Sequence, residues 1–154
     1  TLGGAIASKT RSSDWNAALL ALDATIHTTK ASHMAEDYFS RGGLTEGELI
    51  TKICFEIPSK GIYLKQTRAS STDAVIGVLV SRFEKKCRVA IVGAQRAAFL
   101  CPALETALSK KFHQDVYDHS HIPPGMLSDN ADASLDYQQN LVAILCKKAI
   151  RSCA

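Results

Sequence analysis

The chain has 154 residues, of which 46% are hydrophobic and 21% are charged, and its formal net charge at pH 7 is +3. This composition is typical of a soluble globular protein that buries a core as one domain or two small ones. The basic residues are scattered and their longest runs are pairs, so the charge pattern does not indicate nucleic-acid binding. No apolar run approaches the roughly 20 residues that cross a bilayer, and no signal peptide is visible, which together predict a cytoplasmic protein without a membrane partner.

The five cysteines are widely spaced and contain no CxxC pair. This pattern argues against a disulfide framework, a zinc site or an iron–sulfur cluster held by this chain, and it favours free thiols. Cys54 and Cys87 lie in apolar runs, so we expect small core residues there. His119 and His121 have the spacing of a metal-binding pair, but no third ligand is nearby in the sequence, so we expect loop residues and no metal site.

Near the start of the chain, TLGGAIA places a glycine doublet two residues after Thr1. Such a doublet is typical either of a loop whose amides contact a phosphate or of an ordinary turn. Asp14 then stands at the start of a helical pattern in which Ala17, Leu20 and Ala21 share a face. Its carboxylate suits a helix cap as well as it suits a contact with sugar hydroxyls.

Two strands are predicted after this helix. Residues 24–28 (ATIHT) are polar and β-branched, which is typical of a short strand. Residues 44–58 begin as a turn and become a strand in which Ile53, Phe55 and Ile57 alternate before a proline ends the run.

The remainder of the chain is predicted to be a three-stranded antiparallel meander followed by helices. The predicted strands are residues 62–68, 72–83 and 87–94. The last two form a hairpin across the short turn EKK. Apolar residues at helical spacing then predict helices over residues 102–112 and 131–153. The fold class predicted from this order of elements is α+β.

The segment TLGGAIASKTRSSDWNAALLALDA, residues 1–24, resembles a known motif. It is similar to the second flavin-binding motif of the FAD-containing medium subunits of molybdenum hydroxylases, the family of carbon monoxide dehydrogenase and xanthine dehydrogenase. That motif runs approximately T-[IV]-G-G-N-I-A, then S-D and a helix ending in L-A-L-D-A. Later segments agree in the same order: GELITKICFEIP, IYLKQTRASSTDAVIGVLV, RVAIVGA and SDNADASLDYQQNLVAIL.

This resemblance implies a fold and a division of the chain. Residues 1–58 would form the second lobe of a PCMH-type FAD-binding domain. Residues 59–154 would form a domain like the C-terminal domain of the carbon monoxide dehydrogenase flavoprotein, with a three-stranded antiparallel sheet plus a helical bundle. In the family a first lobe with its own glycine-rich loop precedes this region, so we expect that lobe on a preceding segment or on a separate chain.

The resemblance also implies which residues contact FAD. Thr1, Gly3 and Gly4 match the positions that wrap the pyrophosphate, and Asp14 matches the acidic residue near the sugar-alcohol chain of the flavin. The family asparagine after the two glycines is Ala5 here, which removes a polar side chain from the phosphate-binding segment.

Two further positions would lie near the flavin ring. Lys65 matches the lysine that reaches the flavin, where an ammonium would stabilise the negative charge of the reduced ring. Ile50 matches the apolar residue beside the isoalloxazine, with a spacing difference of two residues.

The function implied by the resemblance is electron transfer. FAD in this subunit would pass electrons to an external acceptor from the 2Fe–2S clusters of a small subunit, while a molybdopterin-binding large subunit oxidises the substrate. No catalytic residue and no metal ligand are then expected on this chain. The alternative is a flavin-free assembly or scaffold module that retains the fold: Ala5 favours it, and the retained Gly3, Gly4, Asp14 and Lys65 oppose it. An unrelated nucleotide-binding domain would leave the matching C-terminal half unexplained.

Overall fold

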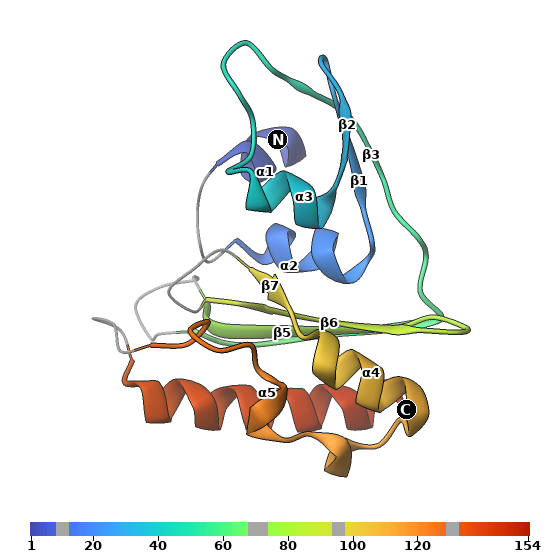
Figure 1. Ribbon diagram of the computed structural model, residues 1–154, viewed down its shortest axis with the longest axis vertical. Helices are drawn as coiled ribbons and strands as arrows, with labels where there is room; N and C mark the ends of the chain where they lie inside the picture. Colours follow the sequence, from blue (N-terminus) through green and yellow to red (C-terminus); the bar gives the residue numbers. More distant parts are fainter. Residues whose placement is uncertain (9–12, 68–73, 94–97, 129–132) are drawn as a thin grey trace.

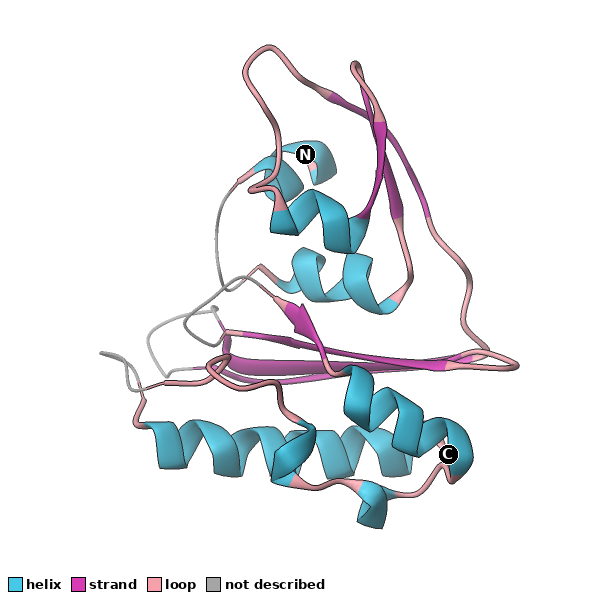
Figure 2. Cartoon of the chain, viewed as in Figure 1, coloured by secondary structure: helices cyan, strands magenta, loops and turns pink. Residues whose placement is uncertain are grey.

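A computed structural model describes residues 1–8, 13–67, 74–93, 98–128 and 133–154 (Figure 1). In these residues the chain forms two antiparallel sheets, one of three strands in the order β2-β1-β3 and one of four strands in the order β4-β5-β6-β7. Helices lie between the two sheets and on the far side of the larger one (Figure 2). The α+β class predicted from the sequence is confirmed.

The helices are α1 (Leu2–Ala7), α2 (Asp14–Ala21), α3 (Ala35–Ser40), α4 (Pro102–Lys110) and α5 (Leu135–Cys153), with short 3-10 helices η1 (Gln114–Val116) and η2 (His119–His121). The strands are β1 (Thr25–Thr28), β2 (Ser32–Met34), β3 (Ile50–Cys54), β4 (Lys60–Thr67), β5 (Ala74–Arg82), β6 (Cys87–Val92) and β7 (Phe99–Leu100). Among the described residues, no helix combines the length and the hydrophobicity needed to span a membrane.

The larger sheet is covered on both faces, which explains why β5 is apolar along nearly its whole length. Val78 and Val80 point toward α5, in the same buried cluster as Val142 and Ile150 of that helix. The other face packs against α2, which contacts both β5 and β6 (Figure 1). Burying both faces of the sheet in this way contributes most of the stability of a domain of this size.

α2 connects the two parts of the molecule. Ala17 and Leu20 of this helix belong to one buried cluster with Ala90 and Val92 of β6. The same cluster includes Ile26 of β1, so the helix is packed between the small sheet and the large one. The predicted helical face of α2 is therefore a core face, as its spacing indicated.

The predicted meander is present as β4-β5-β6, and both C-terminal helices form, α4 over Pro102–Lys110 and α5 over Leu135–Cys153. The predicted three-stranded sheet nevertheless has a fourth strand, β7, whose two residues pair with β6. A two-residue strand carries too little alternation to be recognised in a sequence. The parts of the predicted elements that fall on residues 68, 72–73, 94 and 131–132 lie outside the described residues.

The strand predicted to run to Ile57 ends earlier. β3 pairs with β1 only as far as Cys54, which lies opposite Thr25 at the start of β1. Beyond this point β1 offers no partner, and Phe55 and Ile57 are 55% and 84% exposed. The alternation of apolar residues therefore predicted too long a strand here. Residues with this pattern form a strand only where a neighbouring strand pairs with them.

All five cysteines are free thiols, as expected, but their environments differ. Cys87 is buried, as predicted, whereas Cys54 is only half-buried. Burial raises the pKa of Cys101 and raises that of Cys146 to about 12, which keeps both thiols protonated and unreactive at neutral pH.

We expect a thiol reagent such as DTNB at pH 8 to modify one cysteine of the native chain quickly and the other four only on unfolding. The Cys54→Ser variant should lose the fast phase. Two or more fast thiols in the native wild-type chain would contradict this assignment.

Candidate functional site

The glycine doublet is not a loop, because it forms the first turn of α1. The Thr1 side chain caps this helix, with its Oγ1 accepting a hydrogen bond from the Gly4 N–H at 3.1 Å, and the Thr1 carbonyl accepts one from the Ala5 N–H at 2.9 Å. A Cβ at position 4 would lie 3.1 Å from Thr1 Oγ1, so glycine permits the close cap. The predicted loop is corrected to a helix start, which presents amides in the same way because first-turn N–H groups have no acceptor within the helix.

Ile50 lies beside this helix. A Cβ built on Gly3 would meet only the Cβ of Ile50, at 4.0 Å, and nothing else within that distance. α1 contacts β3, of which Ile50 is the first residue. The structure therefore brings Thr1, Gly3, Gly4 and Ile50 together at one end of the small sheet.

Asp14 and Lys65 form a second group. The Lys65 ammonium lies 2.6 Å from Asp14 Oδ2, although the two residues are 51 positions apart in the sequence. Asp14 is the first residue of α2 and Ser13 is its N-cap residue. The sequence allowed Asp14 to be either a helix cap or a contact for sugar hydroxyls. In the structure it does not cap α2, because its carboxylate contacts β4. The carboxylate stays 42% exposed, so it can still accept a hydrogen bond from a ligand.

Tyr63 completes this second group, and the sequence-based site did not include it. Its hydroxyl donates to Asp14 Oδ1 at 2.5 Å. Burial, followed by the hydrogen bond to Asp14 and the charge of that carboxylate, raises the pKa of Tyr63 far above its ordinary value, so the phenol remains a donor. The available signal was the alternation of β4, which places Tyr63 and Lys65 on the same face.

Gly77 makes room for the tyrosine. It lies opposite Lys65 in the β4–β5 ladder. A Cβ at this position would overlap the Tyr63 hydroxyl and would come within 2.8 Å of Val92 Cγ1. Because Gly77 has no side chain, the Tyr63 ring can lie over it and reach Asp14.

The helices that carry the two groups are in contact, because α1 packs against α2 (Figure 1). Among the described residues, no cluster of three or more histidine, cysteine, aspartate or glutamate side chains is arranged to hold a metal. The helix start and the carboxylate–tyrosine–lysine group together can bind a ligand that carries both an anionic group and hydroxyls.

Solved structures share this fold over 99% of the chain. The chain is similar to quinoline 2-oxidoreductase from Pseudomonas putida 86 (TM-score 0.80, 18% identity) and to carbon monoxide dehydrogenase from Hydrogenophaga pseudoflava that lacks the Mo-pyranopterin moiety (TM-score 0.77, 20% identity). It is likewise similar to reconstituted carbon monoxide dehydrogenase from Oligotropha carboxidovorans (TM-score 0.79, 16% identity). The chain spans 60% of the length of each matched chain. Among curated proteins, none matches its sequence.

The fold is thus the α+β fold of a chain found in these oxidoreductases. Residues 1–60, from α1 to the start of β4, match the family described as the FAD binding domain in molybdopterin dehydrogenase. Over this segment, the match agrees with the resemblance predicted from the sequence.

The residues present fit FAD at two places. At the start of α1, Gly3 carries no side chain, and a Cβ there would meet only Ile50 Cβ, at 4.0 Å, so a phosphate can approach its amide. On the adjacent helix, the exposed edge of Asp14 can accept from a sugar hydroxyl while Tyr63 and Lys65 fix the carboxylate. The Gly4 amide already donates to Thr1, so the phosphate contact depends on the amides of Leu2 and Gly3.

Proposed function

We propose that this chain is the FAD-binding part of a molybdenum hydroxylase and that it passes electrons from iron–sulfur clusters to an external acceptor. The single observation that carries the proposal is the family match over residues 1–60, which includes α1 and Asp14. The ion pair between Asp14 and Lys65 supports it, because it connects this matched segment to a residue outside it that the resemblance also assigns to the flavin.

In this proposal each group of residues has a separate task. Thr1, Gly3 and Gly4 form the helix start that holds the pyrophosphate, with the Leu2 and Gly3 amides as the donors because the Gly4 N–H is bonded to Thr1. Ile50 packs beside the ring. Asp14 binds the sugar-alcohol chain. Lys65 places a positive charge near the ring. The bound flavin supplies the electron-transfer chemistry, whereas the chain supplies binding, orientation and charge.

The partners follow from the same proposal. A molybdopterin-binding large subunit would oxidise the substrate and an iron–sulfur small subunit would deliver the electrons, in a cytoplasmic complex. We also propose that the first FAD-binding lobe is contributed by sequence outside these 154 residues, since the matched chains are longer. We retain the predicted division into residues 1–58 and 59–154 as part of the proposal.

One observation favours the alternative of a flavin-free assembly module. Ala5 replaces the family asparagine, and the Gly4 amide beside it is occupied by Thr1. Purification of the native complex distinguishes the two proposals. Visible flavin absorption with co-purifying large and small subunits supports electron transfer, whereas a colourless complex that stays colourless after FAD is added overturns it.

The Lys65→Met variant tests the flavin site directly. We expect roughly tenfold weaker FAD binding and a lower flavin reduction potential, because the ammonium near the ring and the partner of Asp14 are both lost. Lys148→Met, on the exposed side of α5, is the matched control. Titration calorimetry and a redox titration of the native complex measure both quantities. Equal affinities and potentials for the two variants would contradict the assignment of Lys65.

A further inference from the structure

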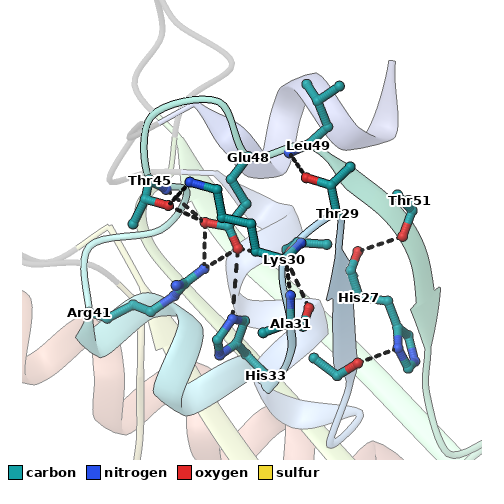
Figure 3. Close-up of polar contacts among 12 residues, drawn as sticks. His27, Thr29, Lys30, Ala31, His33, Arg41, Thr45, Glu48, Leu49 and Thr51 are labelled. Atoms are coloured by element: carbon teal, nitrogen blue, oxygen red, sulfur yellow. Dashed lines mark hydrogen bonds and ion pairs between the residues drawn. The ribbon is translucent and has the colours of Figure 1, made fainter.

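Glu48 is a buried carboxylate at the turn that leads into β3. Its side chain is 1% exposed, and it is surrounded by Arg41, Thr45 and His33 (Figure 3). Oε1 accepts from the Thr28 hydroxyl at 2.6 Å and from Arg41 Nη2 at 3.0 Å. Oε2 accepts from the Thr45 N–H and the Thr45 hydroxyl, both at 2.8 Å. A carboxylate with this many donors is firmly fixed.

These bonds keep Glu48 ionised. The Thr28 hydroxyl first, and then the Thr45 amide, hold the pKa of the carboxyl well below its usual range. The guanidinium of Arg41, on the segment after α3, faces this carboxylate, and so does the His33 ring, whose Nε2 lies 3.8 Å from Oε1. Close to this carboxylate, the Lys30 ammonium donates hydrogen bonds to the Thr45 hydroxyl and to the Glu46 carbonyl.

Thr28, the partner of Glu48, stands at an irregularity in the sheet. The β1–β3 ladder pairs His27 with Lys52 but Thr28 with Ile50, so Thr51 is an extra residue on β3. The Thr51 hydroxyl donates to the His27 carbonyl at 3.2 Å. This arrangement is a β-bulge. Because of the extra residue, side chains on β3 before Thr51 point to the opposite face from the one they would occupy in a regular strand.

The bulge decides which way Ile50 points. In a regular strand Ile50 and Ile53 are three residues apart and would face opposite sides of the sheet. Here both pack against the same buried cluster, and Ile50 lies beside Gly3.

The chain is fixed immediately before Ile50 as well. The Leu49 N–H donates to Thr29 Oγ1 at 3.2 Å, and the Thr29 N–H donates to the Leu49 carbonyl at 2.9 Å (Figure 3). Leu49 directly follows Glu48. The segment from Glu48 to Thr51 is therefore held by hydrogen bonds to the end of β1 and to Thr29, which directly follows it, with the carboxylate at its start.

We propose that Glu48 is a positioning residue for the flavin site: it fixes the β3 bulge through Thr28 and so holds Ile50 against the start of α1. This inference rests on the proposed FAD function, because Ile50 is there the apolar contact of the ring. In this proposal Glu48 acts through its bonds to Thr28, Arg41 and Thr45 and not through the ligand. Its effect is to determine the face of β3 on which Ile50 stands.

The Glu48→Gln variant tests this role, with Glu46→Gln in the same turn as the matched control, since the Glu46 side chain is exposed. The amide keeps the size of the side chain but places an N–H₂ among donors. In the full chain, NMR should show an NOE between the Ile50 methyls and the Gly3 Hα in the wild type and in Glu46→Gln, and its loss in Glu48→Gln. Retention of that NOE in Glu48→Gln would overturn the proposal.

FAD affinity of the native complex provides the functional readout. We expect Glu48→Gln and Ile50→Ala each to weaken binding roughly tenfold, and the double variant to bind no more weakly than Ile50→Ala alone, because both act through one side chain. Additive losses would show that Glu48 acts elsewhere and would overturn the proposal. If the wild-type complex binds no FAD, the proposed function fails, while the NOE experiment still decides the placement of Ile50.

A second variant covers the case in which Glu48→Gln does not fold. Thr28→Val removes the hydroxyl that joins Glu48 to the bulge, together with the bonds of this hydroxyl to Lys30 and Ala31 in the β1–β2 turn. It leaves the bonds from Glu48 to Arg41 and Thr45 in place. It should remain folded, lose the NOE and weaken FAD binding to the same extent. An unchanged NOE and unchanged affinity in this variant would overturn the proposal.

Discussion

Replacing Gly77 by alanine is expected to lower the free energy of unfolding by about 2 kcal/mol, the usual range for an overpacked core position. The new Cβ would overlap the Tyr63 hydroxyl and crowd Val92. Tyr63 must then leave its place, which breaks its hydrogen bond to Asp14. Because Asp14 is a proposed flavin contact, we expect FAD affinity to fall together with stability.

A double-mutant cycle with Tyr63→Phe measures this coupling. Phenylalanine alone loses the charge-assisted hydrogen bond and should cost about 1.5 kcal/mol. In the Gly77→Ala background the bond is already broken, so the same change should cost little or even recover stability. Gly61→Ala is the matched control in β4, since a Cβ there meets only ordinary contacts at 3.7 and 3.9 Å. Urea unfolding gives all of these values. Additive costs would contradict the coupling.

Replacing Arg88 by methionine is expected to cost about 3 kcal/mol at pH 7, the lower end of the range for breaking a buried ion pair, because the Arg88 side chain is 30% exposed. Its Nη1 lies 3.1 Å from Glu105 Oε2 and its Nε lies 2.7 Å from Asp23 Oδ1. The guanidinium thus joins β6 to α4 and to Asp23, two residues after the end of α2. Without it, the Val89 amide is the one donor that the buried Glu105 carboxylate keeps among the described residues.

The loss should depend on pH. Burial raises the pKa of Glu105, while the Val89 N–H and Arg88 lower it, so the variant raises this pKa further. A carboxyl whose folded pKa is raised favours folding below its unfolded pKa, and this contribution is lost as the pH rises through the folded pKa. The Arg88→Met variant should therefore be closer in stability to the wild type at pH 5 than at pH 7.

Adding Glu105→Gln to Arg88→Met should recover part of the stability at pH 7, because no unpaired charge then remains buried. Arg151→Met, at the exposed end of α5, is the control and should change stability by less than about 0.5 kcal/mol. Thermal unfolding at the two pH values measures these differences. An equal loss for Arg88→Met at pH 5 and pH 7 would contradict the role of Glu105.

Much of the fold was predictable because its signals are periodic and local. The meander and α5 follow from long apolar patterns, which packing reinforces. The elements that were missed are short: α1, α3, β2 and β7 each have six residues or fewer. In such segments the contacts that decide the conformation come from elsewhere in the chain, as the Thr1 cap of α1 and the β6 partner of β7 illustrate.

The resemblance gives the candidate site as a list of positions, which stays a prediction, and it gives none of the contacts among them. Tyr63 reaches Asp14 across 49 positions, and only the folded sheet brings the two together. The turn of Ile50 toward Gly3 depends on a single extra residue, Thr51, which no local pattern marks as a bulge. Such contacts require the register of the sheet, and a single sequence does not specify that register.

The position of α2 has a consequence for how the chain could be divided or recombined. The family match ends at residue 60, close to the proposed division, yet α2 covers the face of the large sheet that Ala90 and Val92 present. A fragment that starts at residue 59 would expose this apolar face to water and would be expected to aggregate. A chimera with a relative should therefore exchange α2 and the β5–β6 hairpin together. The packed surfaces of this helix and this hairpin have to match in shape, although the family match ends between them in the sequence.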